Sequence, residues 1–85
     1  MRPKVIFVDV DDTLIRSVGR TRIPIPSAVE AVKRFYREGA VLYLWSSGGV
    51  DYARESAEFL GLIDCFVAFL PKPHLYIDDQ PVADW

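Results

Sequence analysis

The feature that most constrains this chain is a short apolar segment that runs directly into a group of acidic residues. Residues 5–8 are Val-Ile-Phe-Val, a run typical of a short buried strand, and Asp9, Asp11 and Asp12 follow at once. A strand of this kind requires burial, whereas a carboxylate requires water or a partner. We therefore expect the junction to be the end of a strand that opens onto a site.

A second apolar segment ends in the same way. Residues 75–77 are Leu-Tyr-Ile, and Asp78 and Asp79 follow them. If the two strands are parallel neighbours, these carboxylates crowd against Asp9 and Asp11, and two like charges about 4 Å apart repel by roughly 4 kcal/mol at an effective dielectric constant near 20. Such a cluster requires shifted protonation or a bound cation. Ligands that are all oxygen favour a hard ion, with Mg²⁺ first.

Length and composition indicate one soluble domain that spans residues 1–85. The chain is 51% hydrophobic and 26% charged with a net charge of −2, which gives no electrostatic reason to expect nucleic acid or an anionic membrane as a partner. No apolar run approaches the roughly 18 residues of a membrane span. The single cysteine, Cys65, rules out an internal disulfide and favours a reducing compartment, so we expect a cytoplasmic protein.

Turn and cap signals divide the chain into alternating elements. The predicted elements, in chain order, are a strand at about 4–8, a hairpin or flap at about 14–26, a helix from Ser27 to Gly39 with a capping box of Ser27 and Glu30, a strand at 41–45, a helix at 50–60 that Gly61 ends, and strands at 65–70 and 75–77. Strands that alternate with helices are typical of a parallel α/β sheet, in which ligands lie beyond the carboxyl ends of the strands.

Polar residues fall at that predicted edge in a recognisable order. They are Asp9-x-Asp11-x-Thr13-Leu14, then Ser46 after a hydrophobic strand, then Lys72-Pro73, then Asp78-Asp79. This order resembles the four signature motifs of the haloacid dehalogenase-like superfamily, over residues 5–79. The resemblance implies a Rossmann-like three-layer sandwich with a small parallel sheet. It also implies a capless core, because the flap is too short to be a cap domain.

The same resemblance implies a Mg²⁺-dependent phosphatase that acts through an aspartyl-phosphate intermediate. Asp9 would be the nucleophile, and Asp11 would be the general acid and then the general base. Lys72 would neutralise the nucleophile and the transferring group. Thr13 would brace the turn that points Asp11 inward, and Ser46 would hydrogen-bond a phosphoryl oxygen.

Metal and substrate contacts are implied as well. Mg²⁺ would be held by the Asp9 side chain, the main-chain carbonyl of Asp11 and Asp78, with Asp79 acting directly or through water. The loop between the strand at 41–45 and the helix at 50–60 lies at the start of that helix, where free backbone amides commonly bind phosphate. The candidate substrate-binding residues of this loop are Ser46, Ser47 and Gly48, and Ser47 is also a candidate helix cap.

Three arginines of the flap have two interpretations. Arg16, Arg20 and Arg22 lie next to the predicted site, where they either attract an anionic substrate beyond its phosphate or merely solvate an exposed hairpin. The substrate itself, a phosphorylated molecule, is not identified by these residues. A small capless domain with an open sheet edge also makes self-association into a homo-oligomer plausible.

Two other classes of function compete with the phosphatase. A non-catalytic or regulatory binding module would keep the fold without the chemistry, and the small size and missing cap favour it. A receiver-like signalling domain also combines acidic residues, a hydroxyl and a lysine around Mg²⁺. In such a domain the phosphorylated aspartate ends a middle strand, and no aspartate directly follows Leu44 or Leu70.

Overall fold

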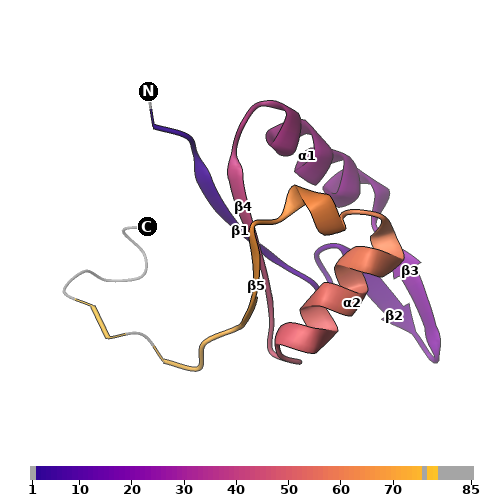
Figure 1. The fold of residues 1–85 in the computed structure, drawn as a ribbon. Helices are drawn as coiled ribbons and strands as arrows, with labels where there is room; N and C mark the ends of the chain where they lie inside the picture. The colour runs from indigo at the N-terminus through magenta and orange to yellow at the C-terminus, as the bar shows by residue number, and fades with distance from the viewer. Residues whose placement is uncertain (1, 76, 79–85) are drawn as a thin grey trace.

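The computed structural model describes residues 2–75 and 77–78 of the chain. The elements in this part, drawn in Figure 1, are β1 (Val5–Asp9), β2 (Ile15–Val18), β3 (Thr21–Pro24), α1 (Pro26–Arg37), β4 (Val41–Ser46), α2 (Val50–Leu60), a short 3₁₀ helix (Ile63–Cys65) and β5 (Ala68–Pro71). The chain is thus a small α/β structure, as predicted.

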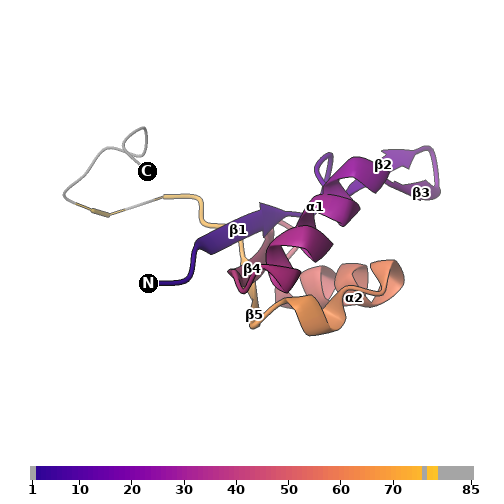
Figure 2. The ribbon, with the colours of Figure 1, turned by 90° about the horizontal axis from the view of Figure 1, so that it is seen from above.

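The predicted parallel sheet is confirmed as a three-stranded sheet with the order β1-β4-β5. Both neighbouring pairs are parallel, and the register sets Asp9 beside Trp45 and Ser46 beside Pro71. The predicted flap is also confirmed, because β2 and β3 form a separate antiparallel hairpin. Seen from above, β1 points toward this hairpin, which stands beyond the carboxyl end of the strand (Figure 2).

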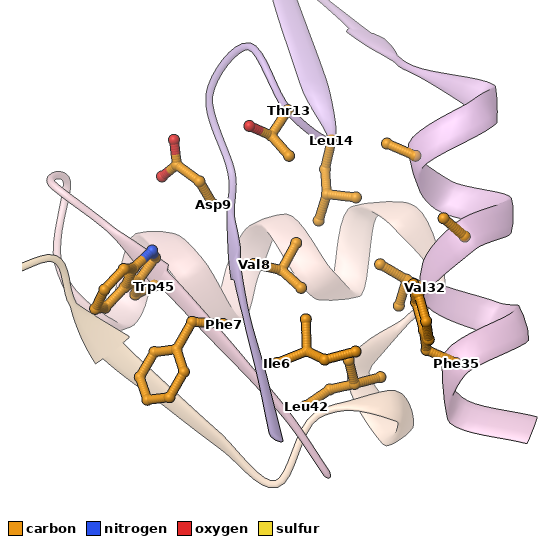
Figure 3. Close-up of a pocket in the computed structure, with 12 residues that line it drawn as sticks. Ile6, Phe7, Val8, Asp9, Thr13, Leu14, Val32, Phe35, Leu42 and Trp45 are labelled. Atoms are coloured by element: carbon orange, nitrogen blue, oxygen red, sulfur yellow. The ribbon is translucent and has the colours of Figure 1, made fainter. Parts of the chain in front are cut away.

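The two faces of the sheet differ in what covers them. Leu42 and Leu44 of β4 are fully buried, and the core they join includes residues of both helices. Tyr43 and Trp45 point to the other face, where they pack against Phe7. Both helices lie on the first side (Figures 1 and 3). The described residues therefore form two layers, and the third layer that the sequence suggested is not seen among them.

Both helices end as the sequence indicates, but α1 does not begin as predicted. Gly61 adopts a left-handed conformation with a φ of 71° at the end of α2, a conformation that glycine allows at low cost. The predicted capping box of Ser27 and Glu30 is wrong. Helix α1 begins one residue earlier, at Pro26, and Ile25 occupies the cap position without a side-chain bond in the described structure. Proline suits this first helical position because its fixed φ already matches the helix and its missing N–H needs no partner there.

The carboxyl-terminal part of the chain departs most from expectation. The strand predicted at 65–70 begins later, at Ala68, because Ile63–Cys65 turns as a 3₁₀ helix. Burial raises the pKa of the Cys65 thiol, which disfavours the reactive thiolate form. No helix of the described residues is long and apolar enough to cross a membrane.

The fourth strand predicted at 75–77 is not formed by the residues that the structure describes. Leu75 and Ile77 are 78% and 95% exposed and belong to no strand, while Tyr76 lies outside the described residues. Parallel neighbours require a crossover connection of about a dozen residues or more. Only residues 72–74 lie between β5 and Leu75, so a short extended link replaces the crossover that a fourth parallel strand would need.

Candidate functional site

Candidate residues gather at the carboxyl edge of the sheet. Asp9 is the last residue of β1, Ser46 is the last residue of β4, and Lys72 directly follows β5. The strands are parallel and in register, so these ends meet at one edge. The sequence prediction that these three residues share an edge agrees with this arrangement.

The Asp9 carboxylate faces a cation. Its Oδ2 atom lies 3.7 Å from Lys72 Nζ, and the two side chains are 30% and 45% exposed. The lysine backbone is tied to the neighbouring strand, because the Lys72 amide donates a 2.9 Å hydrogen bond to the Ser46 carbonyl oxygen. Water screens a half-exposed pair of this kind, so its contribution to stability is small. Its consequence is chemical, because a carboxylate beside an ammonium can approach another anion.

A tight turn carries the next acidic residues away from the strand. The Val10 carbonyl oxygen accepts hydrogen bonds from the amides of Thr13, Leu14 and Ile15, at 3.3, 2.9 and 3.1 Å. Val10, Leu14 and Ile15 are completely buried, so their apolar side chains fix the turn to the core. Asp12 has a φ of 62° in this turn, a left-handed conformation that aspartate tolerates better than most residues.

Thr13 lies in this turn and contributes to bracing it, although the contact is through the backbone. Its amide bonds to Val10, whereas its side chain lines a groove beside Asp9. The groove has a volume of about 350 Å³ and runs between β1 and α1 (Figure 3). Most of its walls are apolar, and Asp9 and Thr13 supply oxygen atoms to it. The groove leaves room beside the Asp9 carboxylate for part of a ligand.

The Asp11 carboxylate has a different partner from Asp9. The Tyr52 hydroxyl, from the first turn of α2, donates a 2.7 Å hydrogen bond to Asp11 Oδ1. This hydrogen bond raises the pKa of Tyr52 above its usual value, and burial adds to the increase. Asp11 therefore accepts a bond from a neutral donor, while Asp9 faces a full positive charge.

Ser46 organises the loop that follows β4. The residue is fully buried, and its hydroxyl accepts a 3.0 Å hydrogen bond from the Gly48 amide. Its carbonyl oxygen accepts a second bond of 3.0 Å from the Gly49 amide. Accepting a bond from Gly48 does not use the proton of the Ser46 hydroxyl, so the predicted contact of this hydroxyl with a phosphoryl oxygen stays a prediction. The amides of Gly48 and Gly49, which were expected to seat phosphate, already have an acceptor.

The remaining loop residues are closer to solvent. Ser47 and Gly48 are exposed, and Gly49 occupies the cap position of α2, so Ser47 is not the cap that the sequence suggested. The first amides of α2, at Val50 and Asp51, have no acceptor within the helix because the intrahelical ladder starts at Ala53. The positive end of the helix is thus still directed at this edge of the sheet.

The three flap arginines separate into two groups. Arg16 and Arg20 are exposed and remain available to attract an anion. Arg22 is committed to the protein, since one terminal nitrogen donates to Ser56 Oγ at 2.8 Å and to the Tyr52 hydroxyl at 3.3 Å. Arg22 therefore holds the flap against α2, whereas substrate binding by Arg16 and Arg20 stays a prediction.

The predicted cluster of four carboxylates is not brought together in the part of the chain that is described. Asp78 is exposed and outside any helix or strand, and Asp79 lies beyond the described residues. Across residues 2–75 and 77–78, no three acidic, histidine or cysteine side chains gather in a metal-binding group. The physical reason is the missing fourth strand, which was the element expected to bring Asp78 beside Asp9.

Sequence reasoning missed Tyr52, Arg22 and Ser56 as a connected group. Tyr52 could have been found from its position, because the first turn after the Ser46–Gly49 loop faces the carboxyl edge of the sheet. Arg22 had a weaker signal, since nothing in a hairpin sequence distinguishes an arginine that folds back from one that points into water.

Comparison with known proteins assigns the chain to a family. A family model described as "Protein of unknown function (DUF705)" matches residues 1–72, which is most of the chain. No curated protein and no solved structure matches the sequence. The assignment to the haloacid dehalogenase-like superfamily from motif order is wrong, because the family that matches these residues is a different one. The chain belongs to the family of proteins of unknown function called DUF705.

Proposed function

We propose that the protein is a Mg²⁺-dependent phosphomonoester hydrolase in which Asp9 attacks phosphorus and carries the phosphoryl group as an aspartyl phosphate. The observation that carries this proposal is the ion pair of Asp9 and Lys72 at the carboxyl edge of a parallel sheet. Ligands of open parallel α/β sheets bind at that edge. The proposal rests on this geometry and on the chemistry of the side chains, not on membership of a known enzyme family.

Asp9 suits the nucleophile because its charge is balanced and its surroundings have space. A carboxylate repels a phosphate dianion unless positive charge lies nearby, and Lys72 Nζ is 3.7 Å away. The adjoining groove provides room for a substrate on one side of Asp9. Forming a covalent intermediate divides one slow hydrolysis into two easier steps.

Asp11 suits the proton-transfer role. It stands two residues beyond Asp9, and its bond from Tyr52 fixes one carboxylate oxygen. In the first step Asp11 would protonate the leaving oxygen of the ester, and in the second step it would take a proton from the attacking water. General acid–base catalysis of this kind contributes about 10²- to 10⁴-fold to a rate.

The donor set is compatible with Mg²⁺. The Asp9 carboxylate and the main-chain carbonyl of Asp11 are hard oxygen donors, and this ion commonly binds through one or two carboxylates, several waters and a substrate phosphate. Asp78 and Asp79 are further candidate ligands. Bound Mg²⁺ would supply charge neutralisation for the phosphate dianion.

Phosphate release from a panel of phosphomonoesters tests the proposal. The purified protein is assayed with Mg²⁺, with excess chelator, and as the Asp9→Asn variant. We expect release that requires both the ion and Asp9. A folded protein that releases no phosphate from small esters, phosphopeptides or phosphorylated nucleic acids would contradict the proposal.

A regulatory binding module is the second candidate. The observation that favours it is that no three acidic, histidine or cysteine side chains of the described residues gather in a metal-binding group. Such a module would bind phosphorylated ligands without turnover. Binding of a phosphorylated ligand, measured by calorimetry, together with no phosphate release would favour the module over the hydrolase.

A further inference from the structure

We propose that Tyr52 is a positioning residue that fixes the Asp11 carboxylate, and that Arg22 of the flap fixes Tyr52 in turn. The kinetic consequence rests on the proposed function, because it concerns the proton transfers assigned to Asp11. The structural part does not, because it concerns contacts that exist whatever the protein does. The group links three separate elements, namely the turn after β1, the helix α2 and the hairpin.

The contact with Asp11 is short and directional. The Tyr52 hydroxyl donates to Asp11 Oδ1 at 2.7 Å, within the range of a bond between a hydroxyl and a charged acceptor. Asp11 is exposed on its turn, so little packing restrains its side chain. Asp9 differs, because its neighbours in β1 and β4 hold its backbone in a ladder. The Tyr52 hydrogen bond is therefore the contact that selects one orientation of Asp11.

The ring of Tyr52 also packs against the loop after β4. A Cβ atom placed on Gly48 would lie 2.8 Å from Cδ2 of the Tyr52 ring, which is too close for any real side chain. Gly48 thus allows the ring to approach the loop directly. Because the same glycine donates its amide to Ser46, the ring, the loop and the end of β4 form one packed unit.

Arg22 holds the other side of Tyr52. Its guanidinium donates to the Tyr52 hydroxyl at 3.3 Å and to Ser56 Oγ at 2.8 Å, and its Cζ lies 5.1 Å from the centre of the Tyr52 ring. Ser56 is fully buried and donates its own hydroxyl proton to the Tyr52 carbonyl oxygen. A guanidinium that donates to a phenol oxygen makes the phenol a better donor to Asp11.

Arg22 is partly buried, which indicates that its side chain is held against α2 and does not extend into solvent. Its Nε atom is buried and has no hydrogen-bond partner among the described residues. Its guanidinium also lies 5.4 Å from the centre of the Phe59 ring. An arginine that only solvated a hairpin would extend into water, where every nitrogen is satisfied. Arg22 instead folds back over α2, so the position of the flap is coupled to the orientation of Asp11.

Kinetics of two variants test the functional consequence. Tyr52→Phe keeps the ring against Gly48 and removes the hydroxyl, and Arg22→Met keeps an apolar stem and removes the guanidinium. We expect Tyr52→Phe to lower kcat about 10- to 100-fold with KM changed less than about 3-fold, because a misoriented acid slows chemistry and not binding. Arg22→Met should also lower kcat, but by a smaller factor than Tyr52→Phe. Tyr36→Phe, at an exposed tyrosine of α1, is the matched control and should leave both constants unchanged.

A double-mutant cycle tests the contact without any activity. Unfolding in urea is measured for wild type, Tyr52→Phe, Asp11→Ala and the double variant. We expect Tyr52→Phe to lower the folding equilibrium constant about 3- to 10-fold when Asp11 is present, and by a clearly smaller factor when position 11 is alanine, where only the bond from Arg22 is lost. Alanine is used because asparagine could still accept the phenol proton.

The two experiments separate the failure of this inference from the failure of the proposed function. If wild type releases no phosphate, the hydrolase proposal fails, and coupling between Tyr52 and Asp11 still supports the positioning contact. If wild type is active and Tyr52→Phe keeps its kcat, the hydrolase stands and the positioning role is overturned. Absence of coupling in the cycle overturns the inference in either case.

Discussion

Asp9 and Asp11 belong to two sides of one site, and their surroundings differ in kind. Asp9 ends a strand and lies 3.7 Å from the Lys72 ammonium, which reaches it from the end of β5. Asp11 stands on a turn and accepts a 2.7 Å bond from the neutral Tyr52 hydroxyl of α2. Two chemically identical carboxylates are thereby suited to different roles. Under the proposed function, the first would attack phosphorus and the second would transfer protons.

The largest effect is expected on the Asp9 side. Asp9→Asn removes the nucleophilic oxygen, so we expect the rate of phosphate release to fall by at least roughly 1,000-fold. Steady-state assays with Mg²⁺ measure this, and an unchanged urea unfolding midpoint shows that the variant is folded. If Asp9→Asn kept a substantial part of the wild-type rate, the two carboxylates would have been assigned the wrong way round.

The next effect sharpens the assignment of Asp11. Asp11→Asn should lower the rate about 10²- to 10⁴-fold for an alkyl phosphate, whose leaving oxygen requires a proton. For p-nitrophenyl phosphate the loss in the first step should be much smaller, because that leaving group departs as an anion. Burst kinetics with the two substrates measure the difference. An equal loss for both substrates would exclude the role of Asp11 as the acid.

Removing the charge of Lys72 tests whether the positive charge beside Asp9 contributes to catalysis. Lys72→Met keeps an unbranched side chain that is one atom shorter and removes its charge, and we expect a fall in kcat of about 100-fold. The matched control is Lys33→Met, because Lys33 pairs with Glu30 on the surface of α1 away from the site. A Lys72→Met variant as active as the Lys33→Met variant would mean that the ion pair with Asp9 has no catalytic role.

The smallest expected effect is a change in KM that distinguishes Arg16 and Arg20 from Arg22. Replacing Arg16 and Arg20 by serine should raise KM for a multiply charged phosphate ester about 2- to 10-fold at low salt, with kcat unchanged, since exposed charges act weakly and at long range. The effect should vanish at high salt. Arg22→Met should behave oppositely, with kcat lowered and KM little changed. If Arg22→Met raised KM and left kcat unchanged, Arg22 would be a substrate-binding residue instead.

The fold up to the end of α2 was largely predictable because local signals agreed with one another. The strand before Asp9, the flap, the strand at 41–45 and the helix at 50–60 were all marked by apolar periodicity together with glycine or proline at their ends. The convergence of Asp9, Ser46 and Lys72 followed from parallel topology. These residues required no knowledge of side-chain contacts, because strand ends determine where they lie.

The remainder depended on geometry that the sequence does not encode locally. The expected strand at 75–77 has suitable residues, but only three residues connect it to β5, and a connection length matters as much as composition. Tyr52 and Arg22 were missed because their partnership spans α2 and the hairpin, and no periodicity reports such a contact. The cytoplasmic location and the self-association inferred from composition stay predictions.

Trapping of the covalent intermediate tests whether Asp9 carries the phosphoryl group. The protein is incubated with Mg²⁺ and its best substrate, quenched, and treated with borohydride, which reduces an aspartyl phosphate to homoserine. Mass spectrometry then locates the modified residue. Our account predicts homoserine at position 9, dependent on Mg²⁺ and on substrate. Phosphate release with no modification of Asp9, or with the modification at Asp11 or Asp12, would contradict it.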